Sequence, residues 1–301
     1  MKSLYLIGGS GFVGKNLARY LYNDYQITIF DKFIDIDFFS TFPSIETCYL
    51  DLSEKQIPES YPTPDYLINL ASIVTAERDL SLFDKLISSN IKILLNLFNR
   101  FKEDKALNLF IQFGSSEEYG NKQPPFTEDM REQPNSPYAL VKQLTTNTAM
   151  MLYTNYKFPI MVVRPGNLFG PMQNAKKIIA YTINMLKKNQ PLNVSLCEQK
   201  RDFIYIEDFA YIIKMLLLNH THCIGQIVNA SSGKSYSLKS IIEFCKKELK
   251  STSKVNYGIV PYRENEIMDM ICSIDKLEEI INKKIDFDIY KGLETINLLN
   301  K

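Results

Sequence analysis

Short apolar runs alternate with amphipathic stretches along the first half of the chain. The runs are rich in β-branched and aromatic residues, which favour strands, and they lie at 3–7, 26–30, 46–50, 66–70, 107–113 and 159–163. Apolar positions at helical spacing predict helices near 12–22, 81–102 and 138–155. Strands that alternate with helices are typical of a parallel sheet with helices on both faces. The pattern therefore predicts an α/β fold with a doubly wound parallel sheet.

The pattern becomes less regular after Arg164. Prolines and glycines interrupt it over residues 165–171. Beyond this break, helical patterns lie near 174–189, 207–219 and 237–250, and short strands near 203–206 and 226–230. We therefore expect a nucleotide-binding domain over residues 1–165, which also carries the reactive residues. A smaller α/β substrate-binding lobe is expected over residues 166–301. The boundary at residue 165 is approximate, because the chain could cross between the two parts.

A glycine-rich turn follows the first expected strand and precedes the first expected helix. Its glycines are Gly8, Gly11 and Gly14, and this order of strand, turn and helix is typical of a dinucleotide-binding βαβ unit. Gly8 can adopt backbone angles that other residues avoid, and Gly14 allows the helix to pack closely on the strand. Gly11 has no side chain to keep a diphosphate away from the free N–H groups of the helix. Phe12 and Val13 belong to the same candidate cofactor site.

The second expected strand ends at Asp31. A carboxylate at this point can hold both hydroxyls of an adenosine ribose and would repel a 2′-phosphate. Lys32 follows directly and weakens that preference. The sequence therefore favours NAD as cofactor over NADP.

Tyr138 and Lys142 lie four residues apart in an expected helix, so they share one face. An ammonium beside a phenol favours the phenolate, which can then exchange a proton with a substrate hydroxyl. The same spacing also occurs in helices that carry a buried ring and a solvated charge. The dinucleotide turn at the start of the chain favours the catalytic interpretation.

Composition excludes several other classes. The chain has 301 residues, 45% hydrophobic content and a formal net charge of +1, which gives no indication of nucleic acid or membrane as partner. Its five cysteines are scattered without a Cys-x-x-Cys pair, as is typical of reduced thiols in the cytosol. The two histidines, His220 and His222, form a His-x-His pair without a nearby acid, so a surface loop is expected and no metal. No secretory signal or membrane span is visible, and we expect a cytoplasmic protein.

Further motifs follow one another over nearly the whole chain. Besides the glycine turn they are Asp51-Leu52, Asn69-Leu70-Ala71-Ser72, Asn90, Ser115-Ser116-Glu117-Glu118-Tyr119-Gly120, Tyr138-x-x-x-Lys142, Arg164 to Pro171, Arg201 to Asp208, and Arg263 to Glu266. In this order and spacing the chain resembles the extended short-chain dehydrogenase/reductase family, in particular its nucleotide-sugar epimerases and dehydratases. The resemblance implies a Rossmann-type fold, NAD as cofactor and a nucleoside-diphosphate sugar as substrate.

The resemblance also implies roles for single residues. Tyr138 would be the acid/base at a sugar hydroxyl, Lys142 would lower its pKa and hold the nicotinamide ribose, and Ser115 would bind the reacting oxygen. The remaining cofactor positions would be the glycine turn, Asp31, Lys32, Asp51, Leu52, Leu70, Ala71, Ser72 and Asn90. The substrate positions would be Ser116 and, at the diphosphate, Asn167, Arg201 and Arg263. Forked guanidinium donors suit a diphosphate, although a surface ion pair is the alternative for each arginine.

The implied chemistry is hydride transfer at C4 of a nucleoside-diphosphate hexose, in cell-surface or secondary sugar biosynthesis. Glu117 lies where 4,6-dehydratases carry the glutamate that removes the C5 proton, but it could also form a solvated pair with Glu118. The run that starts at Arg263 resembles 4-ketoreductases such as CDP-abequose and CDP-paratose synthases. We expect an epimerase or dehydratase first, an NAD(P)H-dependent 4-ketoreductase second, and a non-catalytic NAD-binding regulatory protein third.

Two of the expected helices, 81–102 and 138–155, resemble the pair that family members use to form a four-helix dimer interface. Both carry apolar stripes, although one face of each must also cover the sheet. The resemblance therefore implies a homodimer.

Overall fold

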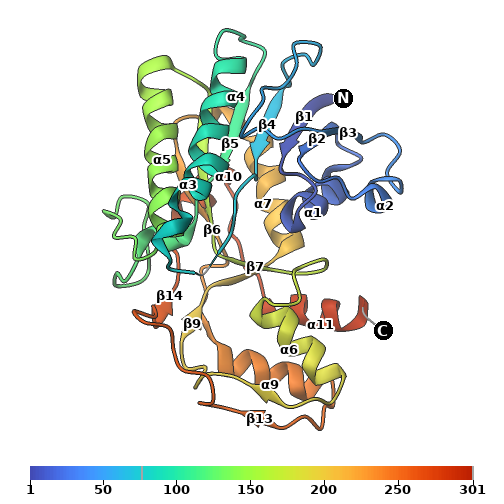
Figure 1. The fold of residues 1–301 in the computed structure, drawn as a ribbon, viewed down its shortest axis with the longest axis vertical. Coiled ribbons are helices and arrows are strands. Elements are labelled where there is room, and N and C mark those ends of the chain that lie inside the picture. Colours follow the sequence, from blue (N-terminus) through green and yellow to red (C-terminus); the bar gives the residue numbers. More distant parts are fainter. Residues whose placement is uncertain (76, 300–301) are drawn as a thin grey trace.

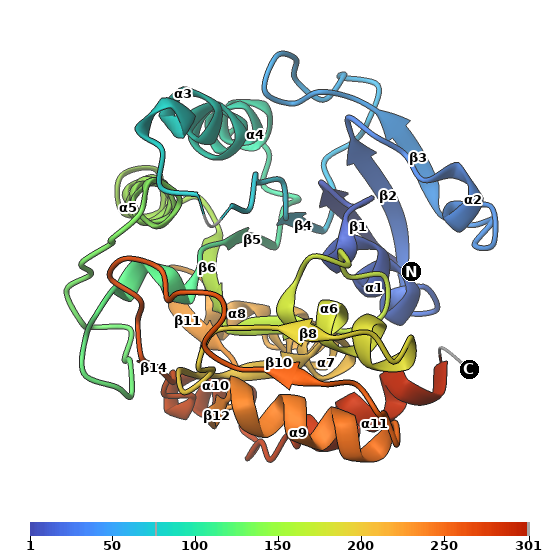
Figure 2. The same cartoon turned by 60° about the horizontal axis from the view of Figure 1, so that its bottom comes forward.

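A seven-stranded sheet with the order β11-β6-β5-β4-β1-β2-β3 forms the centre of the protein (Figures 1 and 2). The computed structural model describes residues 1–75 and 77–299. The strands are β1 (Lys2–Ile7), β2 (Tyr25–Asp31), β3 (Glu46–Tyr49), β4 (Tyr66–Asn69), β5 (Leu109–Phe113), β6 (Ile160–Pro165) and β11 (Ile227–Ala230). All their pairings are parallel, which confirms the expected fold class.

The strand order reverses direction at β1. This strand pairs with β2 on one side and with β4 on the other, so consecutive units extend the sheet in opposite directions. In such sheets a crevice opens beyond the carboxyl ends of the strands at the reversal point. The glycine turn directly follows β1 and therefore lies at this crevice.

Both faces of the sheet are buried, and successive residues of a strand enter different cores. Leu4 and Leu6 of β1 pack with helices α1 (Phe12–Leu21) and α7 (Ile206–Leu218). Tyr5 and Ile7 pack on the other face with α4 (Ile93–Phe101) and α5 (Pro137–Tyr156). Figure 2 shows these helix layers on opposite sides of the sheet. A strand that is buried on both faces is apolar throughout, which explains the uninterrupted runs in the sequence.

The expected helix over 81–102 is one helical segment of mixed geometry. It begins with η1 (Leu80–Leu82) and α3 (Phe83–Ile87), passes through a π-helical turn, η2 (Ser88–Lys92), and continues as α4. Turns of the π type inside α-helices are frequent at functional sites. Ser88 and Ser89 of this turn line the cavity at the crevice.

The second half of the chain builds a lower layer and also returns to the main sheet. Its short strands are β7 (Asn167–Phe169), β8 (Leu192–Asn193), β9 (Lys200–Arg201), β10 (Phe203–Tyr205), β12 (Tyr236–Ser237), β13 (Val255–Asn256) and β14 (Asp269–Met270). Its other helices are α6 (Ile178–Lys187), α8 (His220–Cys223), α9 (Leu238–Glu248), α10 (Asp275–Ile281) and α11 (Ile289–Leu299).

Helices α6, α9 and α11 lie together at one end of the molecule (Figure 1), whereas β11 and α7 belong to the main-sheet layers. The chain therefore crosses back after residue 165, and the division into 1–165 and 166–301 stays a prediction. Two short elements complete the first half, α2 (Ile36–Phe39) and the 3-10 turn η3 (Ser116–Tyr119). None of the described helices has the length and apolar character needed to cross a membrane.

Candidate active site

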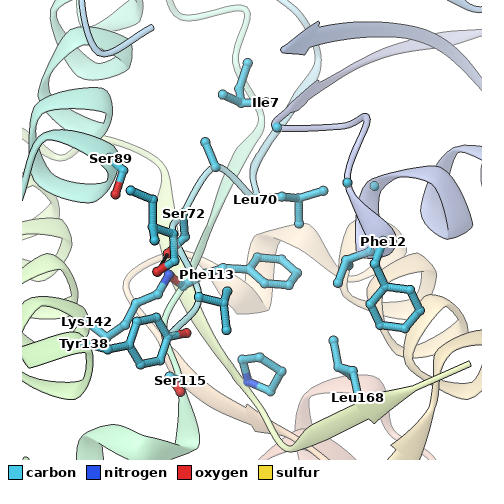
Figure 3. Close-up of a pocket in the computed structure, with 18 of the residues that line it drawn as sticks. Ile7, Phe12, Leu70, Ser72, Ser89, Phe113, Ser115, Tyr138, Lys142 and Leu168 are labelled. Carbon is cyan, nitrogen blue, oxygen red and sulfur yellow. Dashed lines mark hydrogen bonds between the residues drawn. The ribbon is translucent and has the colours of Figure 1, made fainter. Parts of the chain in front are cut away.

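The main cavity, of about 860 Å³, lies at the carboxyl ends of the central strands. Figure 3 shows side chains from the glycine turn, from the ends of β1, β4 and β5, and from α5 around one space. The expected cofactor positions that line it are Gly8, Gly11, Phe12, Val13, Gly14, Asp31, Lys32, Asp51, Leu52, Leu70, Ala71, Ser72, Tyr138 and Lys142. Four further expected site residues also line it: Ser115, Ser116, Glu117 and Asn167.

Gly8 and Gly11 are glycines for different reasons. Gly8 has a φ of +71°, and a Cβ there would approach the backbone nitrogen of Ala71 to 2.7 Å, so the fold itself requires glycine. A Cβ at Gly11 would meet only the Gly8 oxygen, at 3.6 Å. The protein has room for a side chain at Gly11, and its absence keeps the cavity open in front of the first N–H groups of α1. Such groups favour an anion.

Asp31 faces the cavity from the end of β2. Its carboxylate accepts hydrogen bonds from the backbone N–H groups of Ser10, at 2.9 Å, and Phe33, at 3.2 Å. Burial raises the pKa of Asp31, and these bonds oppose that rise. The carboxylate of Asp51 accepts from the Ser53 hydroxyl at 2.6 Å, which lowers the pKa of Asp51. Asp31 and Asp51 line the same cavity as Gly11, and an adenosine ribose and adenine are expected beside them.

Helix α5 presents Tyr138 and Lys142 to the cavity. The helix begins after Ser136, whose hydroxyl accepts from the N–H of Ala139 at 3.1 Å, so Tyr138 lies in its first turn. Lys142 follows one turn later, with its Nζ 5.9 Å from the centre of the Tyr138 ring. That Nζ donates to the Phe113 carbonyl at 3.0 Å, and Ser115 lies near enough to Tyr138 for hydrogen bonding to lower the Tyr138 pKa. Figure 3 shows Ser115, Tyr138 and Lys142 on the same side of the cavity. The expected catalytic side chains are thus neighbours.

Burial shifts the pKa values of Tyr138 and Lys142 in opposite directions. Desolvation raises the pKa of Tyr138 above its ordinary value, the Glu117 carboxylate adds to the rise, and the hydrogen bond with Ser115 opposes it. Desolvation lowers the pKa of Lys142 to about 8. In the protein alone the pKa of Tyr138 thus lies above its ordinary value, and the expectation that Lys142 lowers it stays a prediction.

Glu117 and Glu118 do not form a solvated pair. Glu117 lines the cavity, and burial raises its pKa against the opposing charges of Arg263, Lys177, Arg201 and Arg78. Glu118 is fully buried beneath the cavity wall. Adjacent residues of the 3-10 turn η3 point to different sides, and this separates the two carboxylates.

Three expected positions are not among the residues that line the main cavity, and their roles stay predictions. Asn90 is fully buried within the π-helical turn, where its Nδ2 donates to the Leu86 carbonyl at 2.8 Å, and Ser88 and Ser89 line the cavity in its place. Arg201 and Arg263 do not line the main cavity, although their charges act on Glu117.

Arg201 is held by an ion pair with Glu266 and by the Ile267 carbonyl at 2.6 Å. Its side chain is largely buried, so this ion pair is not a surface contact. The tertiary structure thus ties the guanidinium to the segment that carries Arg263.

Sequence reasoning missed two of the cations that face Glu117. Arg78 follows β4 and Lys177 precedes α6, and no motif marks either of them. It also missed Ser88 and Ser89, which lie in the π-helical turn and line the cavity, and no motif marks them either. Within residues 1–75 and 77–299, no group of three or more His, Cys, Asp or Glu side chains is arranged to hold a metal ion.

The chain is similar to several curated proteins. It is 35% identical over 132 residues to CDP-abequose synthase of Salmonella muenchen, an alignment that covers 44% of this chain and 45% of that protein. It is 27% identical over 237 residues to dTDP-glucose 4,6-dehydratase of Haemophilus influenzae, which covers 69% of this chain and 68% of that one. The chain thus spans less than half of the first relative and about two thirds of the second.

Solved structures share the fold over nearly the full length. A UDP-N-acetylglucosamine 4-epimerase from Methanobrevibacter ruminantium superposes with a TM-score of 0.90 at 23% identity, covering 99% of this chain and 97% of that one. A UDP-glucuronic acid 4-epimerase from Bacillus cereus, solved with UDP-glucuronic acid and NAD, gives a TM-score of 0.90 at 22% identity and 98% coverage of both chains.

The family is shown by a match that spans most of the chain. Residues 4–231 match the model of the NAD dependent epimerase/dehydratase family, and this segment contains the glycine turn, Ser115, Tyr138 and Lys142. The chain therefore belongs to the NAD-dependent epimerase/dehydratase family, with NAD as its cofactor.

Proposed function

We propose that the protein transfers a hydride at C4 of a nucleoside-diphosphate hexose and acts as an epimerase or a 4,6-dehydratase. The observation that carries this proposal is the arrangement of Ser115, Tyr138 and Lys142 around the same cavity as the glycine turn. A protein that only senses NAD has no need for a buried phenol and ammonium beside a serine hydroxyl. The non-catalytic alternative is therefore disfavoured.

The residues of the cavity suit NAD along its length. The N-terminus of α1 beside Gly11 would hold the diphosphate, Asp31 the adenosine ribose, and Asp51 and Leu52 the adenine. Leu70, Ala71 and Ser72 would contact the middle of the cofactor, and Lys142 the nicotinamide ribose. When bound, the oxidised cofactor supplies a hydride acceptor and a positively charged ring.

Tyr138 is the proposed acid/base. Its raised pKa keeps the phenol protonated in the protein alone, so positive charge beside it is needed before it can accept a proton. Ser115 would orient the sugar hydroxyl toward Tyr138, and Lys142 would stabilise the phenolate that accepts the proton. The reverse transfer restores the hydroxyl after the sugar is reduced on either face.

Glu117 bears on the choice of reaction. Glu117 lines the cavity, and its charge raises the pKa of Tyr138. Burial in turn raises the pKa of Glu117 itself. A carboxyl group with these properties can remove a proton from C5 of a 4-keto sugar and return one to a departing hydroxyl. This supports the dehydratase, whereas the fold shared with 4-epimerases is compatible with both reactions.

A second candidate is a 4-ketoreductase. It is favoured by the 35% identity to CDP-abequose synthase over 132 residues. Such an enzyme would consume a reduced cofactor and a ketone that another enzyme has made.

The test is a screen of UDP-, GDP-, CDP- and dTDP-hexoses and their 4-keto forms, read by product NMR and by the near-ultraviolet absorbance of NADH. An epimerase inverts C4 without net reduction of NAD. A dehydratase gives a 4-keto-6-deoxy sugar and, in deuterium oxide, incorporates deuterium at C5. A ketoreductase oxidises NADH only with a keto sugar. A protein that binds NAD and turns over none of these compounds contradicts the proposal.

A further inference from the structure

A charged side-chain cluster lies buried beneath the catalytic residues. Glu118 and Arg164 are both 0% exposed. The Arg164 Nε donates to Oε2 of Glu118 at 2.9 Å, and its Nη2 lies 2.8 Å from the same oxygen. Nη2 also pairs with Glu132 at 2.5 Å, and the guanidinium stacks 4.7 Å from the centre of the Tyr119 ring. A buried charge of this kind is costly unless it is paired, so its position is closely determined.

The second oxygen of Glu118 reaches the catalytic turn. Oε1 accepts a hydrogen bond from the backbone N–H of Ser115 at 2.7 Å. The Ser115 hydroxyl in turn accepts from the N–H of Glu117 at 3.2 Å, which completes a capping box around η3. One carboxylate therefore fixes the backbone that presents both Ser115 and Glu117 to the cavity.

The same carboxylate acts on Lys142. The groups that face this lysine are Glu118 on η3, the Phe113 carbonyl at the end of β5 and Tyr138 on its own helix. The negative charge of Glu118 opposes the effect of burial on the Lys142 pKa. Lys142 and Arg164 supply two positive charges in this region, and Glu118 and Glu132 supply two negative ones.

We propose that Glu118 is a positioning residue that holds Ser115 in place and supplies the buried counter-charge for the Lys142 ammonium. Its effect on turnover rests on the proposed function, whereas its effect on Lys142 does not. The ion pair with Arg164 serves as the anchor that keeps the Glu118 carboxylate in position.

Glu132 offers a matched control. It pairs with the same guanidinium and also hydrogen-bonds Gln143, and within the described residues Ser115 is not among its partners. Glu132→Gln therefore perturbs the Arg164 ion pairs without touching the catalytic turn. Glu118→Gln removes the charge but keeps an oxygen for Ser115, and Glu118→Asp keeps the charge but shortens its reach.

The first measurement needs no substrate. The pKa of Lys142 is followed by NMR of protein labelled at the lysine ¹³Cε, with the signal assigned by its loss in Lys142→Met. Glu118→Gln is expected to lower that pKa by about one pH unit, and Glu118→Asp and Glu132→Gln by clearly less. An unchanged pKa in Glu118→Gln, or an equal change in Glu132→Gln, overturns the counter-charge role.

The second measurement uses the substrate found in the screen. Glu118→Asp is expected to lower kcat about tenfold with little change in KM, because Ser115 loses its anchor, while Glu132→Gln stays within about threefold of wild type. The pH profile of kcat/KM in Glu118→Gln should shift toward acid. Wild-type kcat in Glu118→Asp, together with an unshifted profile in Glu118→Gln, overturns the positioning role.

The two proposals fail in distinguishable ways. A wild-type protein without turnover contradicts the proposed function, and the NMR measurement then still tests the charge on Lys142. If Glu118→Gln does not fold, as judged by circular dichroism, Glu118→Asp provides the kinetic test.

Discussion

Tyr138 and Lys142 show how strongly burial governs a single side chain. Tyr138 is 6% exposed and Lys142 is 2% exposed. Loss of hydration favours the neutral form of each, the protonated phenol and the free amine. The cation that the proposed chemistry requires must therefore be maintained by neighbouring charges, and Glu118 is one of them.

At this scale, Tyr138→Phe tests the acid/base. The variant keeps the ring and its packing, so folding and NAD affinity should stay close to wild type, while kcat falls by about 10²–10⁴-fold. Calorimetric titration with NAD and turnover of the identified substrate are the measurements. Tyr156→Phe, which removes a hydroxyl from an exposed tyrosine of the same helix, is the control. Near-normal turnover in Tyr138→Phe would refute the assigned role.

Lys142 also gives a stability prediction with a definite sign. Its pKa is about 8 in the folded protein against an ordinary value of 10.5, so the unfolded chain binds the proton more tightly. This penalty is fully present below pH 8 and disappears as the pH rises through 10.5. Lys142→Met should therefore be more stable than wild type near neutral pH, by up to ~3 kcal/mol less the lost hydrogen bond to Phe113.

Urea unfolding as a function of pH measures this difference. The advantage of Lys142→Met should shrink steadily as the pH is raised above 8. Lys55→Met, at an exposed lysine, should show no such trend. If the difference in unfolding free energy between Lys142→Met and wild type does not change with pH, the low pKa of Lys142 in the folded protein is contradicted.

At the scale of elements, the turn between β1 and α1 combines a folding constraint with a binding constraint. Gly8 permits the turn itself, and Gly11 leaves the N-terminus of α1 accessible from the cavity. Gly8 therefore sets the backbone geometry of the turn and Gly11 the access of a ligand to it, and the two can be tested by separate substitutions.

Gly8→Ala should affect mainly stability, and Gly11→Ala mainly NAD binding. Gly8→Ala places a side chain at positive φ and against Ala71, so it should cost more than about 1 kcal/mol in unfolding free energy. Gly11→Ala should leave stability within about 0.5 kcal/mol but weaken NAD binding about tenfold, because the methyl group projects toward the diphosphate. Urea unfolding and NAD calorimetry give both quantities. If Gly11→Ala binds NAD as tightly as the wild type, the proposal that the diphosphate binds at this turn is wrong.

At the scale of the whole molecule, one helical layer retains exposed apolar side chains. Ile87 of α3, Leu95 of α4, and Leu144 and Met151 of α5 are all exposed. These helices form the outer layer on one face of the main sheet (Figure 2). Apolar groups gathered on a helical layer favour association with a second copy, as the expected four-helix interface requires.

The prediction at this scale is a homodimer. Light scattering of the wild-type protein should give twice the mass of the chain, and Leu144→Glu should give the monomer mass, because it buries a charge in the interface. Met268→Glu introduces the same change at an exposed methionine of the second half of the chain and should remain dimeric. A monomeric wild-type mass contradicts this arrangement.

The sequence alone determined the parallel sheet, the glycine turn and the placement of Tyr138 above Lys142. These depend on periodicity and on residues close together in the chain, so they can be deduced without coordinates. Asp31 belongs to the same group, because it simply ends the strand that follows the turn.

The tertiary structure decided the charge states and the fine assignment of roles. Glu117 and Glu118 are adjacent in sequence, yet one lines the cavity while the other is bound by Arg164, which lies 46 residues away. The direction of the Tyr138 pKa shift likewise depends on burial, and Asn90 is fully buried inside a π-helical turn that no sequence pattern predicted. Desolvation and pairing are set by neighbours in space, and a pattern along the chain does not contain them.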